Sequence, residues 1–135
     1  MIWFVIGPLP YEESGVSTKL RHEMEAWEAH YYETEGPDFT WRSREDQYHH
    51  AEAGRRLAER LSVEVGPAFE VEYFDQHDRK LRVRSDRPAT NEAAEAAFTR
   101  VGAWHRRLFE RIARQADAEA DFGWHASNPE GGADR

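Results

Sequence analysis

A chain of 135 residues has room for one ordinary domain with a hydrophobic core, and its 39 % apolar and 33 % charged residues fit neither a disordered nor a membrane protein. The absence of cysteine excludes disulfides, thiolate catalysis and cysteine-ligated metal sites. The net charge of −8 disfavours general binding of nucleic acids, because their phosphates attract basic residues. We expect one soluble domain over residues 1–126 and a flexible tail over residues 127–135.

The chain opens with an apolar run of β-branched and aromatic residues at positions 2–6, which is typical of a buried strand. Gly7, Pro8 and Pro10 follow and predict a loop, because proline lacks the amide proton that strand pairing uses. The run has neither the basic start nor the small-residue cleavage site of a signal peptide. We therefore expect a central or covered first strand in a cytoplasmic protein.

A first helix should follow this loop. Ser17 can cap it, and Gly36 with Pro37 should end it. Arg21 and Glu25 are spaced to pair one turn apart. Apolar side chains recur along it every three or four residues, at Leu20, Met24, Trp27 and Tyr31.

A second helix should begin near Ser43, because Asp46 three residues later completes a pattern that resembles a capping box. It should run to about Leu61, ahead of the helix-breaking Gly66 and Pro67. Its predicted buried face comprises Tyr48, Ala51, Leu57, Ala58 and Leu61, with Gly54 near the centre.

Residues 69–84 predict a β-hairpin, since apolar and charged side chains alternate along both arms. Matching the apolar faces gives four facing pairs: Tyr73 with Leu81, Val71 with Val83, Glu72 with Arg82 and Glu70 with Arg84. A slip by one residue would put apolar side chains opposite arginines on both faces. This register leaves residues 76–78 as the loop.

A long third helix should start after Asn91 or Thr90, with Glu92 and Glu95 in its first turn. A sustained apolar stripe makes it the predicted main packing surface: Ala94, Ala97, Phe98, Val101, Trp104, Leu108, Ile112 and Ala116. The order β-α-α-β-β-α predicts an α+β fold, with a small antiparallel sheet that includes the β-hairpin and three helices packed mainly on one face.

Residues 45–52, EDQYHHAE, place adjacent histidines on the second helix. At 100° per residue, His49 points about 140° away from the buried face, so an exposed pair with Glu45 is expected. His50 lies only about 40° from the centre of that face and needs a partner. Asp46, one turn earlier, would orient the ring and favour its charged form. A satisfied core histidine is the purely structural alternative.

His105 lies about 30° from the centre of the apolar stripe on the third helix. If the second and third helices share one core, His50 and His105 would converge on an aromatic pocket as a general acid or base, with Asp46 orienting His50, or as two ligands of a catalytic metal. Candidates for the other walls are Tyr31, Tyr48, Tyr73 and Trp104. The alternative is two separate packing sites.

Residues 79–114 contain ten basic and four acidic residues, a local charge of +6 that leaves −14 for the rest. Four arginines on the third helix form an Arg stripe beside its apolar face: Arg100, Arg107, Arg111 and Arg114. With Arg82 and Arg84, the Arg stripe suits phosphates or carboxylates. The competing interpretation is neutralisation by acidic residues within the chain: Glu25, Glu28 and Glu110.

Known catalytic motifs are missing: no phosphate-binding glycine loop, serine-hydrolase elbow or dinucleotide fingerprint occurs. The sequence assigns no residue to a metal site and leaves any cofactor unknown. The favoured function is a small acidic binding protein of inhibitor, immunity or adaptor type. It would contact a protein partner or itself as a homodimer, and binding is favoured over catalysis. The alternatives are a small enzyme or ligand-binding protein that uses His50 and His105, and anion or nucleic-acid binding through the Arg stripe.

Overall fold

The computed structural model describes residues 2–4, 7–34, 40–75 and 79–126. The chain divides into two compact units, residues 1–99 and residues 100–135. The predicted single domain over residues 1–126 stays a prediction, and the predicted tail at residues 127–135 lies outside the described residues.

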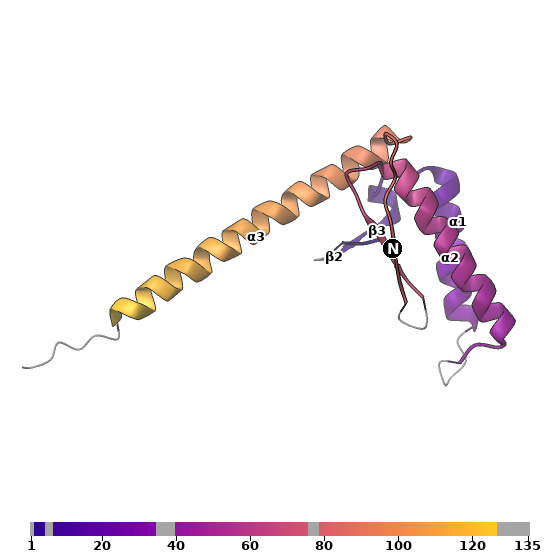
Figure 1. Cartoon of the computed structure of the whole chain (residues 1–135), viewed down its shortest axis with the longest axis horizontal. Coiled ribbons are helices and arrows are strands. Elements are labelled where there is room, and N and C mark those ends of the chain that lie inside the picture. The colour runs from indigo at the N-terminus through magenta and orange to yellow at the C-terminus, as the bar shows by residue number, and fades with distance from the viewer. Residues whose placement is uncertain (1, 5–6, 35–39, 76–78, 127–135) are drawn as a thin grey trace, which may run out of the picture. The chain divides into compact units, whose positions relative to one another are not determined.

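The secondary structure confirms the predicted α+β class (Figure 1). The helices are α1 (Thr18–Thr34), α2 (Arg44–Val65) and α3 (Glu92–Ala126), with a short 3-10 turn at Tyr11–Glu13. The strands are β1 (Ile2–Phe4), β2 (Gly7–Leu9), β3 (Val71–Phe74) and β4 (Lys80–Val83), and they form two antiparallel pairs, β1 with β2 and β3 with β4.

Strand β2 occupies the segment that was predicted to be a loop, so that prediction was wrong. It pairs with β1 so that Pro8 faces Trp3. Proline is tolerated because β2 has β1 as its single strand neighbour in the described chain, and an edge strand can leave the position of the missing amide proton unpaired. Ile2 is buried, as expected of a covered strand, although β1 is not central.

The β3–β4 hairpin has the predicted register. Val71 faces Val83, Glu72 faces Arg82, and Tyr73 faces Leu81. On the outer face, the side-chain N and O atoms are 3.2 Å apart between Arg82 and Glu72 and 3.8 Å apart between Arg84 and Glu70. Residues 76–78 lie outside the described residues. Charge and apolar alternation therefore select the same strand pairing.

The predicted residues cap each helix. The amide of Leu20 donates to Ser17 Oγ at the start of α1, and the amide of Asp46 donates to Ser43 Oγ at the start of α2. Asn91, not Thr90, caps α3, because its Oδ1 accepts from the first amides of that helix. The predicted end of α1 at Gly36 and Pro37 lies outside the described residues.

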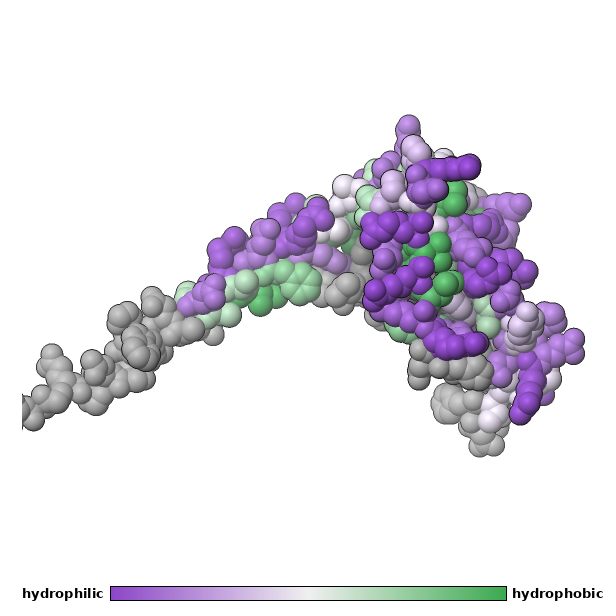
Figure 2. Space-filling view, in the orientation of Figure 1, coloured by the Kyte–Doolittle hydropathy of each residue, from purple (hydrophilic) through white to green (hydrophobic). Residues whose placement is uncertain are grey.

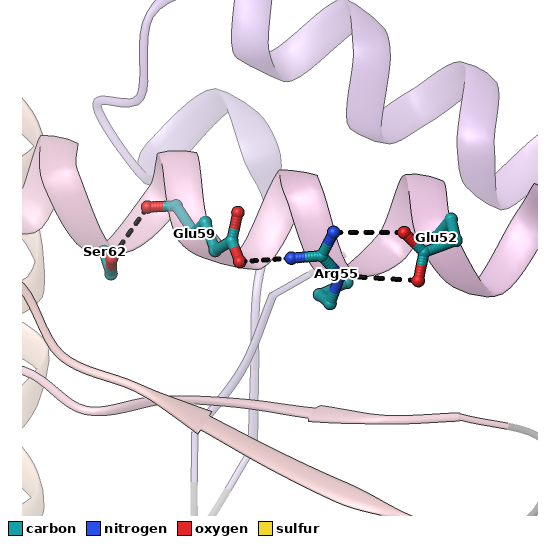
Figure 3. Close-up of polar contacts among 4 residues, drawn as sticks. All are labelled: Glu52, Arg55, Glu59 and Ser62. Carbon is teal, nitrogen blue, oxygen red and sulfur yellow. Dashed lines mark hydrogen bonds and ion pairs between the residues drawn. The ribbon is translucent and has the colours of Figure 1, made fainter.

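Helix α2 continues four residues beyond its predicted end, from Leu61 to Val65, where the amide of Gly66 closes the last turn onto Ser62 O. On its outer side, Arg55 lies between Glu52 and Glu59, as Figure 3 shows. These are exposed ion pairs along one helix, each worth less than about 1 kcal/mol.

The core of the first unit lies between α1, α2 and the β3–β4 hairpin. Its buried apolar side chains include Leu20, Leu57, Leu61 and Val65. A carboxylate ties three helix ends together, since Glu64 near the end of α2 accepts hydrogen bonds from Ser17 N at 2.8 Å and from Asn91 Nδ2 at 2.9 Å. The starts of α1 and α3 are thereby fixed to the end of α2.

The apolar stripe of α3 is buried over its first two turns, which belong to the first unit. Ala94, Ala97 and Phe98 are at most 4 % exposed, whereas Trp104 is 54 % and Ile112 is 51 % exposed. A hydrophobic band along α3 is visible in Figure 2. The predicted packing role is therefore confirmed over these first turns, and it stays a prediction for the rest of the stripe, which belongs to the second unit.

Candidate functional site

Four aromatic side chains surround His50 on α2. We call this group the His50 cluster: Trp27, His30, Tyr31 and Trp41 around His50. The Trp27 ring stacks on the imidazole with centroids 4.5 Å apart, and Trp41 lies 4.9 Å away at a tilt. His30 and Tyr31 complete the cluster at 5.6 Å and 5.8 Å. Trp27 and Tyr31 reach it because α1 presents its apolar side to α2, as the helical spacing predicts.

The His50 side chain is only 3 % exposed, as predicted, but its predicted partner is wrong. Asp46 Oδ1 lies 3.3 Å from His30 Nε2, and the buried Nδ1 of His50 has no hydrogen-bond partner in the described part of the chain. Burial first, and then the charge of His30, lower the pKa of His50 from 6.5 to about 4, although Asp46 opposes this shift. His50 is therefore neutral at physiological pH, contrary to the expected charged form.

The two residues that precede His50 on α2 are both exposed. His49 is exposed, and its Nε2 lies 3.6 Å from Glu45 Oε1, which confirms the predicted surface pair. Tyr48 is 63 % exposed, so its predicted place on the buried face is wrong. Tyr48 lies at the edge of the predicted face. Burial there depends on which elements pack against α2 and not on the helical periodicity of the sequence.

A cavity of about 860 Å³ lies in the first unit, bounded by α1, α2 and β3. Its walls are mainly apolar and include Met24, Trp27, Leu57, Leu61, Val71 and Tyr73. Tyr73, one of the predicted binding residues, packs directly over Gly54, where a Cβ atom would come within 2.6 Å of the phenol ring. Burial raises the pKa of Tyr73 to about 12, so its hydroxyl stays protonated at neutral pH.

The remaining predicted pocket residues, His105 and Trp104, belong to the second unit. Their rings contact each other with centroids 5.3 Å apart, and Trp104 is exposed. His50 belongs to the first unit and has the ring neighbours given above. The convergence of His50 with His105, and any catalytic role of His50, His105 or Asp46, stay predictions.

The Arg stripe is exposed along α3 and forms no ion pair with a residue that the structure describes. Of the acidic residues expected to neutralise it, Glu25 pairs with Arg21, and Glu28 accepts a hydrogen bond from Tyr11. Arg82 and Arg84 differ from the stripe, because they pair with Glu70 and Glu72 on the hairpin. Binding by the Arg stripe stays a prediction.

Sequence reasoning missed His30 and Trp41 as members of the His50 cluster. His30 follows Trp27 by three residues, and this spacing places it on the same side of α1. Trp41 precedes α2 and gave no periodic signal. One feature of the sequence pointed to the cavity, namely Gly54 near the centre of the predicted buried face of the second helix. A glycine at such a position allows another element to approach closely.

No group of three or more His, Asp or Glu side chains suited to a metal ion occurs among the described residues. No helix within the described ranges has the length and apolar character to cross a membrane.

Comparison with known proteins gives one family. The family model of Serratia CdiI immunity protein-like proteins matches residues 2–76, which include β1, β2, α1, α2 and β3. No curated protein and no solved structure matches the chain. The matched segment covers more than half of the 135 residues and builds the His50 cluster and nearly all of the cavity wall. The chain therefore belongs to the Serratia CdiI immunity protein-like family.

Proposed function

We propose that this protein neutralises a toxin by binding the toxin directly through the surface of residues 2–76. The observation that carries the proposal is the family match over that segment, since an immunity protein inhibits its toxin by protein contact. This sharpens the inhibitor, immunity or adaptor function expected from the sequence to the immunity type.

Charge supports a basic partner surface. Residues 2–76 contain seven basic and sixteen acidic residues, a net −9. Opposite charge on a partner accelerates encounter and disfavours wrong partners, although it adds less to the final affinity. We therefore expect a toxin with a basic surface, and an association rate that falls as salt is added.

The test is neutralisation followed by binding. Candidate toxin domains from the source organism are expressed in a host with and without this chain, and growth is measured. The expected result is restored growth with one toxin and a one-to-one complex of the purified proteins by light scattering. If this chain restores growth against none of the candidates, the immunity function is wrong. Fractionation of the same cells tests the predicted cytoplasmic location.

A second candidate function, binding of an anionic partner, is favoured by the exposure of the Arg stripe and its lack of ion pairs with described residues. It predicts that the full chain binds a short RNA or DNA duplex at low salt, with an affinity that falls steeply as salt rises. Replacing Arg107 and Arg111 by glutamine should then weaken binding. No binding at low salt would remove this function.

The histidine-based enzyme is less favoured than either binding function. His50 is buried beneath Trp27 and Trp41, and it is not among the residues that line the cavity. The homodimer stays a prediction, which the mass of the free chain by light scattering will test.

A further inference from the structure

We propose that the cavity bounded by α1, α2 and β3 is the toxin-docking site, and that it receives an apolar segment of the toxin flanked by basic residues. The inference rests on the proposed immunity function and adds to it the place and the chemistry of contact.

The shape and size of the cavity fit such an anchor. A volume of about 860 Å³ is large enough for more than one apolar side chain, within the range of about 300–1,000 Å³ typical of binding pockets. The floor comes from α2, with Leu57 and Ala58 at most 8 % exposed. Trp27 and Tyr73, whose rings meet edge to face with centroids 5.9 Å apart, form one aromatic wall. Hot spots of protein interfaces are anchors that fill desolvated pockets of this kind.

The rim indicates a protein rather than a small ligand. Phe74 lines the cavity yet is 58 % exposed. Glu70 and Glu72 also line it and are exposed, and they form ion pairs with Lys80, Arg82 and Arg84. An exposed aromatic next to a concave apolar surface with a charged border is typical of a protein interface. Figure 2 shows hydrophobic side chains between the hairpin and α2, framed by hydrophilic residues.

Two observations select the toxin over a second copy of the chain. All lining residues except Phe98 lie within residues 2–76, the segment that defines the family. That segment carries a net charge of −9, so two copies that met at their cavities would repel each other, whereas a basic toxin surface would be attracted. A segment with apolar anchors between lysines or arginines would fit both the apolar cavity and the net negative charge of residues 2–76.

The test uses two cavity variants of the full chain, each with a matched control. Ala58→Leu fills the cavity from its floor, and Ala26→Leu makes the same change at an exposed position of α1 that does not line it. Phe74→Ser removes the rim aromatic, and Phe109→Ser removes another half-exposed phenylalanine, on α3. The probe is the toxin domain that the wild-type chain neutralises, and the readouts are growth, Kd by calorimetry and the unfolding midpoint.

We expect Ala58→Leu and Phe74→Ser each to raise Kd at least tenfold while the controls stay within about twofold of the wild type. Phe74 is exposed, so Phe74→Ser should fold like the wild type. It therefore tests the docking site even if Ala58→Leu folds poorly. Wild-type affinity in both cavity variants would overturn the docking site and leave the immunity function intact. Failure of the wild-type chain to neutralise any toxin would overturn both.

Other occupants of the cavity have distinct signatures. A free chain with the mass of a dimer that becomes a monomer in Ala58→Leu would assign the cavity to a second copy. A small molecule seen by native mass spectrometry in the wild type, but not in Ala58→Leu, would assign it to a ligand. Either result would overturn the proposal.

Discussion

The indole of Trp27 lies nearly parallel to the imidazole of His50, with ring centroids 4.5 Å apart and planes 15° from parallel. Trp27 Nε1 also donates a hydrogen bond to the backbone carbonyl of His50 at 2.9 Å. One side chain of α1 therefore contacts both the ring and the backbone of the same residue on α2. This places a titratable group inside the helix pair, where its protonation must affect stability.

His50 makes the fold less stable in mild acid. Its pKa is 6.5 in the unfolded chain and about 4 in the fold, so between these values the unfolded chain binds a proton that the folded chain does not. Stability therefore falls as the pH falls through this window, by about 2 kcal/mol from pH 8 to pH 5. Urea unfolding midpoints of the wild type and of His50→Phe across these pH values measure the effect.

The adjacent histidine is the control for this prediction. His49→Phe should keep the wild-type pH dependence of stability, because His49 is exposed. In His50→Phe, the decrease in the free energy of unfolding from pH 8 to pH 5 should be smaller than in the wild type by about 2 kcal/mol. His30 and Asp46 remain in both variants, so the difference measures His50 together with its electrostatic coupling to these two neighbours. Equal slopes in the two variants would show that His50 is not the group responsible.

Gly54 is required for the approach of Tyr73 to α2. A Cβ atom at this position would lie 2.6 Å from the Tyr73 ring, and the ring cannot move without opening the Trp27 contact. Gly54→Ala should destabilise the fold by about 1–3 kcal/mol, which outweighs the helix propensity of alanine. Thermal and urea unfolding of the purified variant measure the loss.

Gly102→Ala is the matched substitution on α3. Its Cβ would have Arg106 as its nearest neighbour at 3.8 Å, an ordinary contact, so alanine should stabilise the helix by about 0.5–1 kcal/mol. The two glycine variants should thus shift the unfolding midpoint in opposite directions. A gain in stability in Gly54→Ala would mean that Tyr73 does not pack there.

The fold was predictable where its determinants are local. The hairpin register followed from charge and apolar alternation within residues 69–84, and each capping residue stands beside the helix that it caps. Strand β2 was not predictable, because proline is unfavourable in a strand unless the pairing of neighbouring strands leaves its edge open. That pairing depends on β1 and is invisible in the local sequence.

The candidate site was predictable only in part, for a similar reason. Helical angles placed His50 inside and His49 outside, because both positions are fixed by one helix. The partners of His50 come from α1 and from the segment before α2, so the actual pairing of Asp46 with His30 could not be read from α2 alone. The cavity likewise depends on three elements meeting, of which the sequence showed only Gly54.

The carboxylate of Glu64 should be a major source of stability in the first unit. It accepts hydrogen bonds from Ser17 N and Oγ and from Asn91 Nδ2. Glu64→Ala would leave the two Ser17 donors without this partner, while Asn91 Nδ2 would keep its bond to Gly15 O. We expect a loss of about 2–3 kcal/mol in the free energy of unfolding. Glu59→Ala, which removes an exposed ion pair with Arg55, should cost less than about 1 kcal/mol. Similar losses in both variants would contradict the linking role of Glu64.

On the outer face of the hairpin, reversing the charge of Glu72 alone should destabilise the fold more than reversing the charges of Glu72 and Arg82 together. Arg82 lies opposite Glu72, and Lys80 Nζ is 2.8 Å from the same carboxylate. Glu72→Arg would put three cations together and should cost up to about 1 kcal/mol, while adding Arg82→Glu restores one cross-strand attraction and should recover part of this loss. A double-mutant cycle by urea unfolding measures the coupling, which should shrink in 1 M salt because these residues are solvent-accessible. A coupling of zero at low salt would mean that the register is held by the apolar pairs Val71–Val83 and Tyr73–Leu81 alone.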